Sequence, residues 1–193
     1  MNSLVQSVTD ALSALTVLTG IGIILILFFL GLKKFGAESD FSKRALDFLG
    51  ARAMLFSFLI ALGSMVSSLF YSGVAGFVPC PLCWWQRIFL FPQVFVLAVA
   101  LARKDVHARV YTLTLSALGG IIAAYHTYIT FGGSQLIPCS ASGITEACTK
   151  IYFLEYGYVT IPTMALTAFA AIAVLAIVEG IVLEKRGGSF VNR

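Results

Sequence analysis

Apolar residues along the chain gather in five long runs, and most of the charged residues lie in the segments between them. The runs cover approximately residues 11–32, 53–71, 84–101, 110–131 and 161–183. Crossing the hydrocarbon core of a bilayer takes about 20 mostly apolar residues, and a chain in lipid must satisfy its backbone hydrogen bonds internally. Because the alternating pattern of a barrel strand is absent, the runs predict five transmembrane helices and an all-α membrane protein.

The composition supports this interpretation and weakens two others. The chain is 59% hydrophobic and 11% charged, whereas about a quarter of the residues are charged in an average soluble domain. A net charge of +4 is compatible with nucleic-acid binding. However, the basic residues are spread between the apolar runs and form no single patch, so no nucleic-acid partner is expected.

The first run is expected to be a retained anchor, with a cleaved signal peptide as the alternative. A signal peptide has a positively charged start and an apolar core of about 7–15 residues. The first 32 residues contain no Lys or Arg, and the run is longer than such a core. Lys33 and Lys34 follow it directly.

The basic residues predict the orientation of the helices, because Lys and Arg in short loops mark the cytoplasmic side. Eleven of the 13 basic residues lie in segments 33–52, 103–109 and 185–193. Five crossings put these three segments on one side and leave the N-terminus on the other. Loops 72–83 and 132–160 then lie outside, and they contain all four cysteines.

The four cysteines are Cys80, Cys83, Cys139 and Cys148. An even number on the oxidising side fits two disulfides, and four cysteines allow three pairings. Proximity in the sequence favours Cys80–Cys83 and Cys139–Cys148 without excluding the others. A bridge across two intervening residues removes little chain entropy. A Cys80–Cys83 disulfide would therefore stabilise the fold little and is better suited to a redox role.

Two other interpretations of the cysteines stay open. They could form purely structural disulfides in a multi-span membrane protein without enzymatic activity. They could also form a four-thiolate zinc site, although eight residues separate the second pair, more than in the usual short knuckle. Covalent haem attachment requires a histidine directly after the second cysteine, and Trp84 occupies that position.

The residues after Cys83 favour thiol–disulfide exchange. With a helix beginning near Trp84, Cys83 is expected at its N-cap, where the helix dipole favours a thiolate. Arg87 follows one turn deeper on the same face. Taken singly, Arg87 could extend to lipid headgroups and Trp84 could belong to the aromatic belt at the membrane surface. Their combination with a Cys-x-x-Cys pair is more specific.

These residues resemble the DsbB/BdbC family of membrane disulfide bond formation proteins. CPLCWWQR at 80–87 is similar to the family's Cys-x-Leu-Cys-x-x-(Glu/Gln)-Arg signature, and YGYVTIP at 156–162 is similar to the BdbC branch. The resemblance covers about residues 53–183 and implies a four-helix transmembrane bundle with two extracytoplasmic cysteine loops. Residues 1–52 would then form an extra transmembrane anchor with a cytoplasmic loop, and residues 184–193 a cytoplasmic tail.

The resemblance also implies a mechanism. A separate thioredoxin-fold, DsbA-like oxidase would attack the Cys139–Cys148 disulfide and form a mixed disulfide with Cys139. Cys148 would then attack Cys80, and the electrons would reach Cys80–Cys83 and a quinone, either ubiquinone or menaquinone. Such a protein is an oxidoreductase of the cytoplasmic membrane that supports disulfide formation in exported proteins.

By the same resemblance, Arg87 would bind a quinone carbonyl, with Cys83 as the thiolate beside the ring. Trp84 and His126 are further candidates for the quinone site, and His126 could instead pack at the interface with a backbone carbonyl as its partner. Gln86 stands where many relatives carry Glu. The related vitamin K epoxide reductases have their loop cysteines first and their Cys-x-x-Cys late, the reverse of the order seen in this chain.

Overall fold

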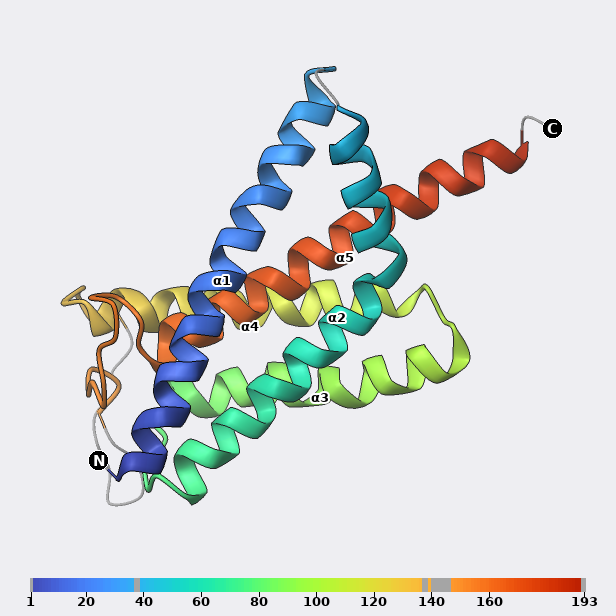
Figure 1. Ribbon diagram of the computed structural model, residues 1–193. Coiled ribbons are helices and arrows are strands. Elements are labelled where there is room, and N and C mark those ends of the chain that lie inside the picture. Colours follow the sequence, from blue (N-terminus) through green and yellow to red (C-terminus); the bar gives the residue numbers. More distant parts are fainter. Residues whose placement is uncertain (1, 37–38, 137–138, 140–146, 192–193) are drawn as a thin grey trace.

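The computed structural model describes residues 2–36, 39–136, 139 and 147–191, and for residues 185–191 it describes the backbone alone. Within these ranges the chain forms five helices: α1 (Ser3–Lys34), α2 (Asp40–Gly73), α3 (Pro81–Arg103), α4 (Ala108–Thr130) and α5 (Ile161–Val191) (Figure 1). All five are long and apolar enough to cross a membrane. The predicted all-α membrane protein, with a four-helix bundle and an extra N-terminal helix, is confirmed.

The helices extend beyond the apolar runs, most of all at the start of α2. This helix begins at Asp40, and Ser39 and Ser42 cap it reciprocally: the Ser42 backbone N–H donates to Ser39 Oγ at 3.2 Å, and the Ser39 N–H donates to Ser42 Oγ at 3.1 Å. Such a capping box satisfies two backbone donors that a helix start would otherwise leave unpaired. Hydropathy identifies the span, but it does not detect polar turns that continue the helix.

Helix α5 lies at the centre of the bundle. It packs against α1, α2 and α4, while α3 packs between α2 and α4. In α5, 61% of the most apolar window is buried within the protein, whereas the corresponding share in α1 is 0%. A core cluster joins α2, α3, α4 and α5 through Ala61, Leu90, Val94, Leu97, Ala123, Phe169 and Ile172. The extra helix α1 therefore lies on the outside of a four-helix core.

Helix α1 contacts the core in two separate places. Near its start, Val5, Thr9 and Ser13 are buried. Near its end, apolar side chains pack against a second cluster in α2 and α5; the α1 members are Ile23, Ile26, Phe29 and Leu30, and the cluster is Leu46, Val174, Val178 and Val182. Between these two contacts α1 has no buried residue.

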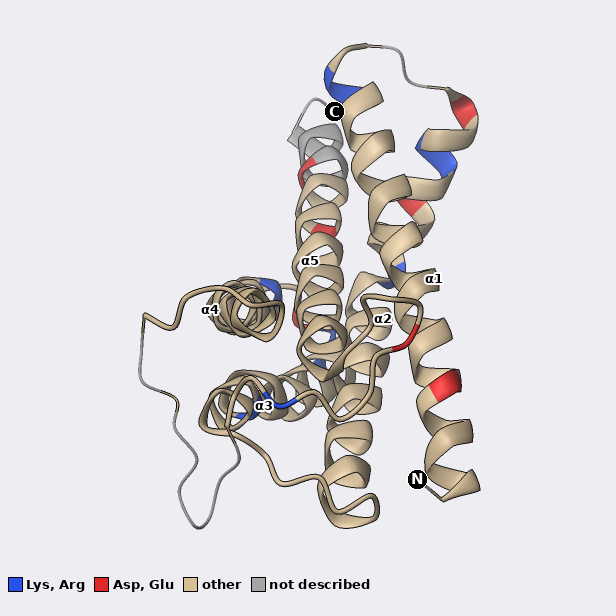
Figure 2. Ribbon diagram, turned by 90° about the vertical axis from the view of Figure 1, so that its left-hand side faces the viewer, with Lys and Arg blue, Asp and Glu red and all other residues tan. Residues whose placement is uncertain are grey.

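The segments between helices lie at two ends of the bundle. The cysteine end, as we call it, consists of residues 74–80, the described part of 131–160 and the N-terminus (Figure 1). Gln6 Nε2 donates to Glu155 Oε1 there at 3.4 Å, which links the start of α1 to the second loop. The α1–α2 connection lies at the opposite end, and Figure 2 shows Lys and Arg gathered around it.

Candidate redox site at the cysteine end

The first turn of α3 positions the Cys-x-x-Cys pair. Cys80 is the N-cap, with extended backbone angles of −76° and 168°, and Pro81 is the first helical residue. Proline suits this position because its fixed φ matches the helix and its missing N–H is not needed there. The prediction that Cys83 caps the helix is wrong. Cys83 lies within the first turn, and its backbone N–H donates to Cys80 Sγ at 3.2 Å.

The two cysteine pairs differ in their sulfur geometry. Cys139 and Cys148 form a disulfide with their Cα atoms 5.8 Å apart. Cys80 and Cys83 are free thiols, and their sulfurs are 2.7 Å apart. The hydrogen-bonded sulfur of Cys83, together with burial, raises the pKa of the Cys80 thiol above its usual range. When the pair is reduced, Cys80 therefore holds its proton more readily than an ordinary thiol does.

The two pairs meet at Cys80 and Cys148. The sulfurs of these residues and a ring nitrogen of His126 all lie within 4.8 Å of one another. Cys80 and Cys148 are 4% and 1% exposed and share an apolar cluster with Leu82 and Ile129. The Cys139–Cys148 disulfide, in the loop between α4 and α5, therefore lies next to the first turn of α3.

His126, on α4, connects both pairs. Its Nδ1 is 2.9 Å from Gln86 Nε2, and its Nε2 is 3.0 Å from the Cys148 carbonyl oxygen and 3.6 Å from Cys80 Sγ. An amide N–H can only donate and a carbonyl oxygen can only accept. The ring therefore accepts at Nδ1 and donates from Nε2 to the Cys148 carbonyl. This donor is also within reach of the Cys80 sulfur.

Arg87 is held on the other side of the dithiol. Its Nε donates to Ser68 Oγ at 2.8 Å, and its Nη2 donates to the Ser68 carbonyl at 3.0 Å. The guanidinium carbon lies 5.1 Å from the centre of the Trp84 ring. A guanidinium has five N–H groups, so the two bonds to Ser68 leave others free to bind a ligand.

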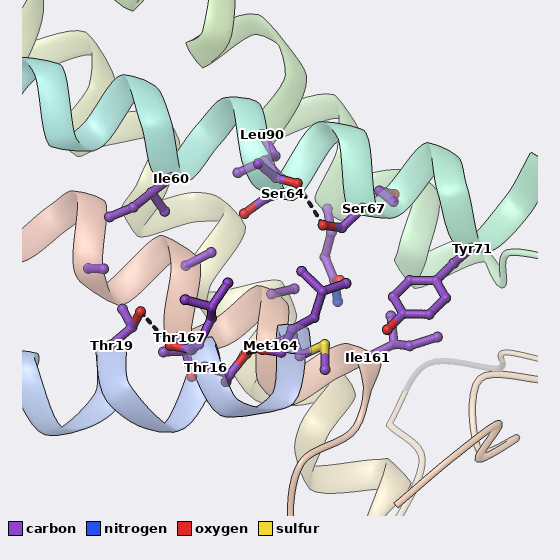
Figure 3. A pocket seen from close by; sticks show the side chains of 18 of the residues that line it. Thr16, Thr19, Ile60, Ser64, Ser67, Tyr71, Leu90, Ile161, Met164 and Thr167 are labelled. Carbon is purple, nitrogen blue, oxygen red and sulfur yellow. Dashed lines mark hydrogen bonds between the residues drawn. The ribbon is translucent and has the colours of Figure 1, made fainter. Parts of the chain in front are cut away.

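A large apolar cavity opens beside Cys83 and Arg87. Its volume is about 540 Å³, and it extends between α1, α2 and α5 (Figure 3). A second cavity of about 30 Å³ is lined by Cys80, His126 and Cys148, among others. Cys83 borders both cavities. The dithiol therefore separates a small compartment that faces the loop disulfide from a large one that extends along the helices.

Aromatic residues pack the segment before Cys80 against the segment after Cys148. The rings of Phe77 and Tyr152 stack with centroids 4.3 Å apart, and the Tyr152 hydroxyl donates to the Val78 carbonyl at 2.9 Å. The Tyr71 ring also stacks with Phe77, with centroids 5.6 Å apart. These contacts fix the segment before Cys80 against the segment after Cys148.

The structure thus brings together most of the residues that the sequence singles out. Cys80, Cys83, Cys148 and His126 form one cluster, and Arg87 with Trp84 lies one turn along α3. Neither Trp84, which is 51% exposed, nor His126 is among the residues that line the large cavity. The contribution of Ser68 was not predicted, and no local signal identifies a serine 19 residues before its partner on another helix.

This arrangement leaves too few free thiolates for the four-thiolate zinc site. The Cys139–Cys148 disulfide removes two of the four thiolates that it requires. Among the described residues, the one group of potential ligands is Cys80, His126 and Cys148. Structural zinc sites almost always have four protein ligands, whereas this group offers three, and the Cys148 sulfur is already engaged in the disulfide.

A bundle of membrane-spanning helices with a dithiol and a disulfide in contact at one end defines a membrane protein of thiol–disulfide chemistry. Residues 50–179 match the family model described as disulfide bond formation protein DsbB. The chain belongs to this family and is a multi-pass membrane protein of disulfide bond formation. The predicted resemblance is confirmed.

Curated relatives agree with this assignment. The chain is 41% identical over 119 residues to the SPbeta prophage-derived disulfide bond formation protein B of Bacillus subtilis, covering 62% of this chain and 78% of the relative. It is 39% identical over 127 residues to a probable disulfide formation protein of Metapseudomonas resinovorans (65% and 87%). It is 36% identical over 121 residues to disulfide bond formation protein C of Bacillus subtilis (61% and 85%). No solved structure matches the chain significantly.

Proposed function

We propose that this protein reoxidises a separate thioredoxin-fold, DsbA-like oxidase and passes the electrons to a quinone in the membrane. One observation carries the proposal. The Cys80 and Cys148 sulfurs lie within 4.8 Å of each other, so the loop disulfide and the helix dithiol can exchange without large movement. The dithiol in turn borders an apolar cavity about 540 Å³ in volume, within the range of typical ligand sites.

The thiol steps balance as follows, starting with both pairs oxidised. A partner thiolate attacks Cys139, forms a mixed disulfide and releases Cys148 as a thiolate. Cys148 attacks Cys80, which breaks the Cys80–Cys83 bond and releases Cys83 as a thiolate. The second partner thiol resolves the mixed disulfide, and the partner leaves oxidised while Cys139 is released. Cys139 then attacks Cys148, which restores their disulfide and leaves Cys80 and Cys83 reduced.

The sequence of steps ends with the Cys139–Cys148 pair closed and the Cys80–Cys83 pair reduced. The dithiol then holds the two electrons taken from the partner. A quinone would supply the acceptor for these two electrons and the accompanying protons. Cys83 is the sulfur best placed to face it, because Cys83 borders the large cavity and Cys80 does not.

Arg87 is proposed to bind a carbonyl oxygen of the quinone. Ser68 fixes the guanidinium at the cavity wall, and charge-assisted hydrogen bonds there are stronger than in water. A donor positioned where negative charge develops stabilises that charge without further reorganisation. Trp84 supports the guanidinium through the contact of its ring.

His126 is proposed to serve the thiol exchange. Its Nε2–H holds the Cys148 carbonyl and can stabilise negative charge on the Cys80 sulfur. Gln86 fixes the ring in this tautomer. Direct contact between His126 and the quinone, as the resemblance implies, stays a prediction, because His126 lines the small cavity.

The orientation and the division of the chain are also proposals. The cysteine end and the N-terminus would face the extracytoplasmic side, and the Lys- and Arg-rich connections would face the cytoplasm. Residues 1–52 would form the added anchor and its cytoplasmic loop, residues 53–183 the redox bundle, and residues 184–193 a cytoplasmic tail.

The experiment is quinone reduction by the purified protein without oxygen, with a reduced thioredoxin-fold protein as donor. Quinone absorbance is followed for the wild type, Cys83→Ser and Cys139→Ser. We expect bleaching with the wild type and with neither variant. Bleaching by Cys139→Ser would mean that the donor reaches Cys80–Cys83 directly. No bleaching by the wild type, with the disulfides intact, would favour purely structural disulfides.

A further inference from the structure

The large cavity extends far beyond the residues that the redox chemistry uses. Cys83 and Arg87 line one part of it, and Leu49 lines another. Along α1 its wall runs from Leu12 to Ile26, which is about 21 Å at the rise of an α-helix. Figure 3 shows side chains from α1, α2 and α5 pointing into the same space. The cavity is therefore a long groove with the redox site on its wall.

The wall of the groove is suited to hydrocarbon. Several hydroxyl groups line it, and three of those in the groove between α1 and α2 donate to carbonyls of their own helix. Thr16 donates to the Leu12 carbonyl at 2.8 Å and Thr19 to the Leu15 carbonyl at 2.7 Å. On the facing helix, Ser67 donates to the Gly63 carbonyl at 2.7 Å. With these donors satisfied locally, the wall offers mainly methyl and methylene groups.

Helix α1 stands away from α2 along this groove and approaches it at the ends. At the cysteine end, the Tyr71 hydroxyl donates to Thr9 Oγ1 at 3.3 Å. At the opposite end, the Phe29 and Phe41 rings meet edge to face at 6.1 Å. Between these contacts, Cβ atoms added at Gly22 or Gly63 would meet no heavy atom within 4 Å. Both glycines line the groove, one from α1 and one from α2, and they leave space within it for a ligand.

We propose that this groove holds the isoprenoid chain of the quinone whose ring is bound at Cys83 and Arg87. Helix α1, which lies outside the family match at residues 50–179, would then be the wall that makes this protein prefer long-tailed quinones. The inference rests on the proposed function. Continuity favours this occupant, since one cavity contains both the redox-active sulfur and the apolar groove. A lipid acyl chain is the competing occupant.

The test narrows the groove and compares two quinones. Gly22→Phe places a ring in the groove, because Gly22 lines it. Gly20→Phe is the matched control: Gly20 is on the same helix, does not line the groove, and has no heavy atom within 4 Å of an added Cβ. Gly63→Phe narrows the groove from α2. It gives an independent groove variant in case Gly22→Phe does not fold.

The quinones share one ring, and only one of them carries a long isoprenoid chain. We expect the wild type and Gly20→Phe to have a higher kcat/KM for the long-tailed quinone. In Gly22→Phe and Gly63→Phe the ratio of the two kcat/KM values should fall roughly tenfold, which corresponds to about 1.4 kcal/mol. As a second readout, mass spectrometry of the purified proteins should find less co-purified quinone in the two groove variants than in Gly20→Phe.

The outcomes separate the inference from the function on which it rests. If the wild type reduces neither quinone, the proposed function fails. If it reduces both and the groove variants keep the wild-type ratio, the inference fails while the function stands. Phospholipid that co-purifies with the wild type and is lost from Gly22→Phe, with an unchanged ratio, would assign the groove to lipid and overturn the inference.

Discussion

At the scale of single residues, the site depends on how two polar side chains are held. Arg87 is fixed by Ser68, on α2, through two hydrogen bonds at 2.8 and 3.0 Å. His126 is fixed by Gln86 and the Cys148 carbonyl, at 2.9 and 3.0 Å. Each set of hydrogen bonds holds a side chain to which we assign a role: Arg87 toward the quinone carbonyl, and His126 toward the Cys80 sulfur. Changes in these hydrogen bonds therefore test the assigned roles.

Replacing Arg87 by lysine should weaken quinone binding while the charge is retained. Lysine is a point charge and lacks the planar fork that makes both bonds to Ser68. Hydrogen bonds to charged groups contribute about 1.5–3 kcal/mol, so the KM for quinone should rise about tenfold or more in Arg87→Lys. Ser68→Ala removes only the bond to the hydroxyl and should raise the KM a few-fold. Equal KM values in both variants and the wild type would contradict the role of Arg87.

Replacing Gln86 by leucine should slow the thiol exchange. The change removes the hydrogen-bond donor to His126 Nδ1. An unpaired buried polar group lowers the free energy of unfolding by about 1–3 kcal/mol. The imidazole ring is then also free to rotate away from Cys80. Gln93→Leu is the matched control, because Gln93 is also buried on α3 and accepts from Ser116 Oγ at 3.1 Å. Both variants should melt several degrees lower. Only Gln86→Leu should slow the reduction of Cys80–Cys83 by the partner in a single turnover, and equal slowing in both would indicate general destabilisation.

The sequence identified the residues that one short motif supplies. Cys80, Cys83 and Arg87 lie within two turns at the start of one helix, so their proximity follows from local helix geometry. The contacts of Arg87 with Ser68 and of His126 with Gln86 join residues 19 and 40 positions apart. Such contacts depend on how helices pack, which hydropathy does not encode. The N-cap was misassigned because Pro81 starts the helix three residues before the apolar run.

At the scale of helices, the position of the site depends on the close approach of α4 to α5. Gly119 is fully covered by the Phe169 ring, which contacts the place where a Cβ would stand. Phe169 is itself 0% exposed and belongs to the core cluster. Because His126 is two turns further along α4, a shift of this helix would also move the histidine away from Cys80.

Gly119→Ala should therefore destabilise the bundle. The added methyl group would overlap the Phe169 ring, and overpacking of this kind costs about 1–3 kcal/mol. Gly120→Ala is the control, because its nearest heavy atom, Phe169 Cβ, would be 3.7 Å from the added Cβ. Thermal unfolding in detergent should show a melting temperature several degrees lower for Gly119→Ala. A lower value for Gly120→Ala alone would contradict this packing.

At the scale of the whole molecule, the separation of basic residues and cysteines is the basis for the proposed orientation in the membrane. The N-terminus and the cysteine-bearing loops lie at one end, and Lys and Arg gather around the α1–α2 connection at the other (Figure 2). In a cysteine-free background, Ser3→Cys should react with a membrane-impermeant maleimide in intact cells, and Ser39→Cys should react only after lysis. The reverse labelling would invert the proposed orientation.

The central claim is that electrons pass between the two loops through Cys80 and Cys148. The most direct test compares two double variants of the full chain under mild oxidation, with disulfides mapped by mass spectrometry. Cys83→Ala with Cys139→Ala retains Cys80 and Cys148, and Cys83→Ala with Cys148→Ala retains Cys80 and Cys139. The account predicts a Cys80–Cys148 disulfide within one chain that forms faster than Cys80–Cys139. Faster formation of Cys80–Cys139, or free thiols in the first variant, would contradict it.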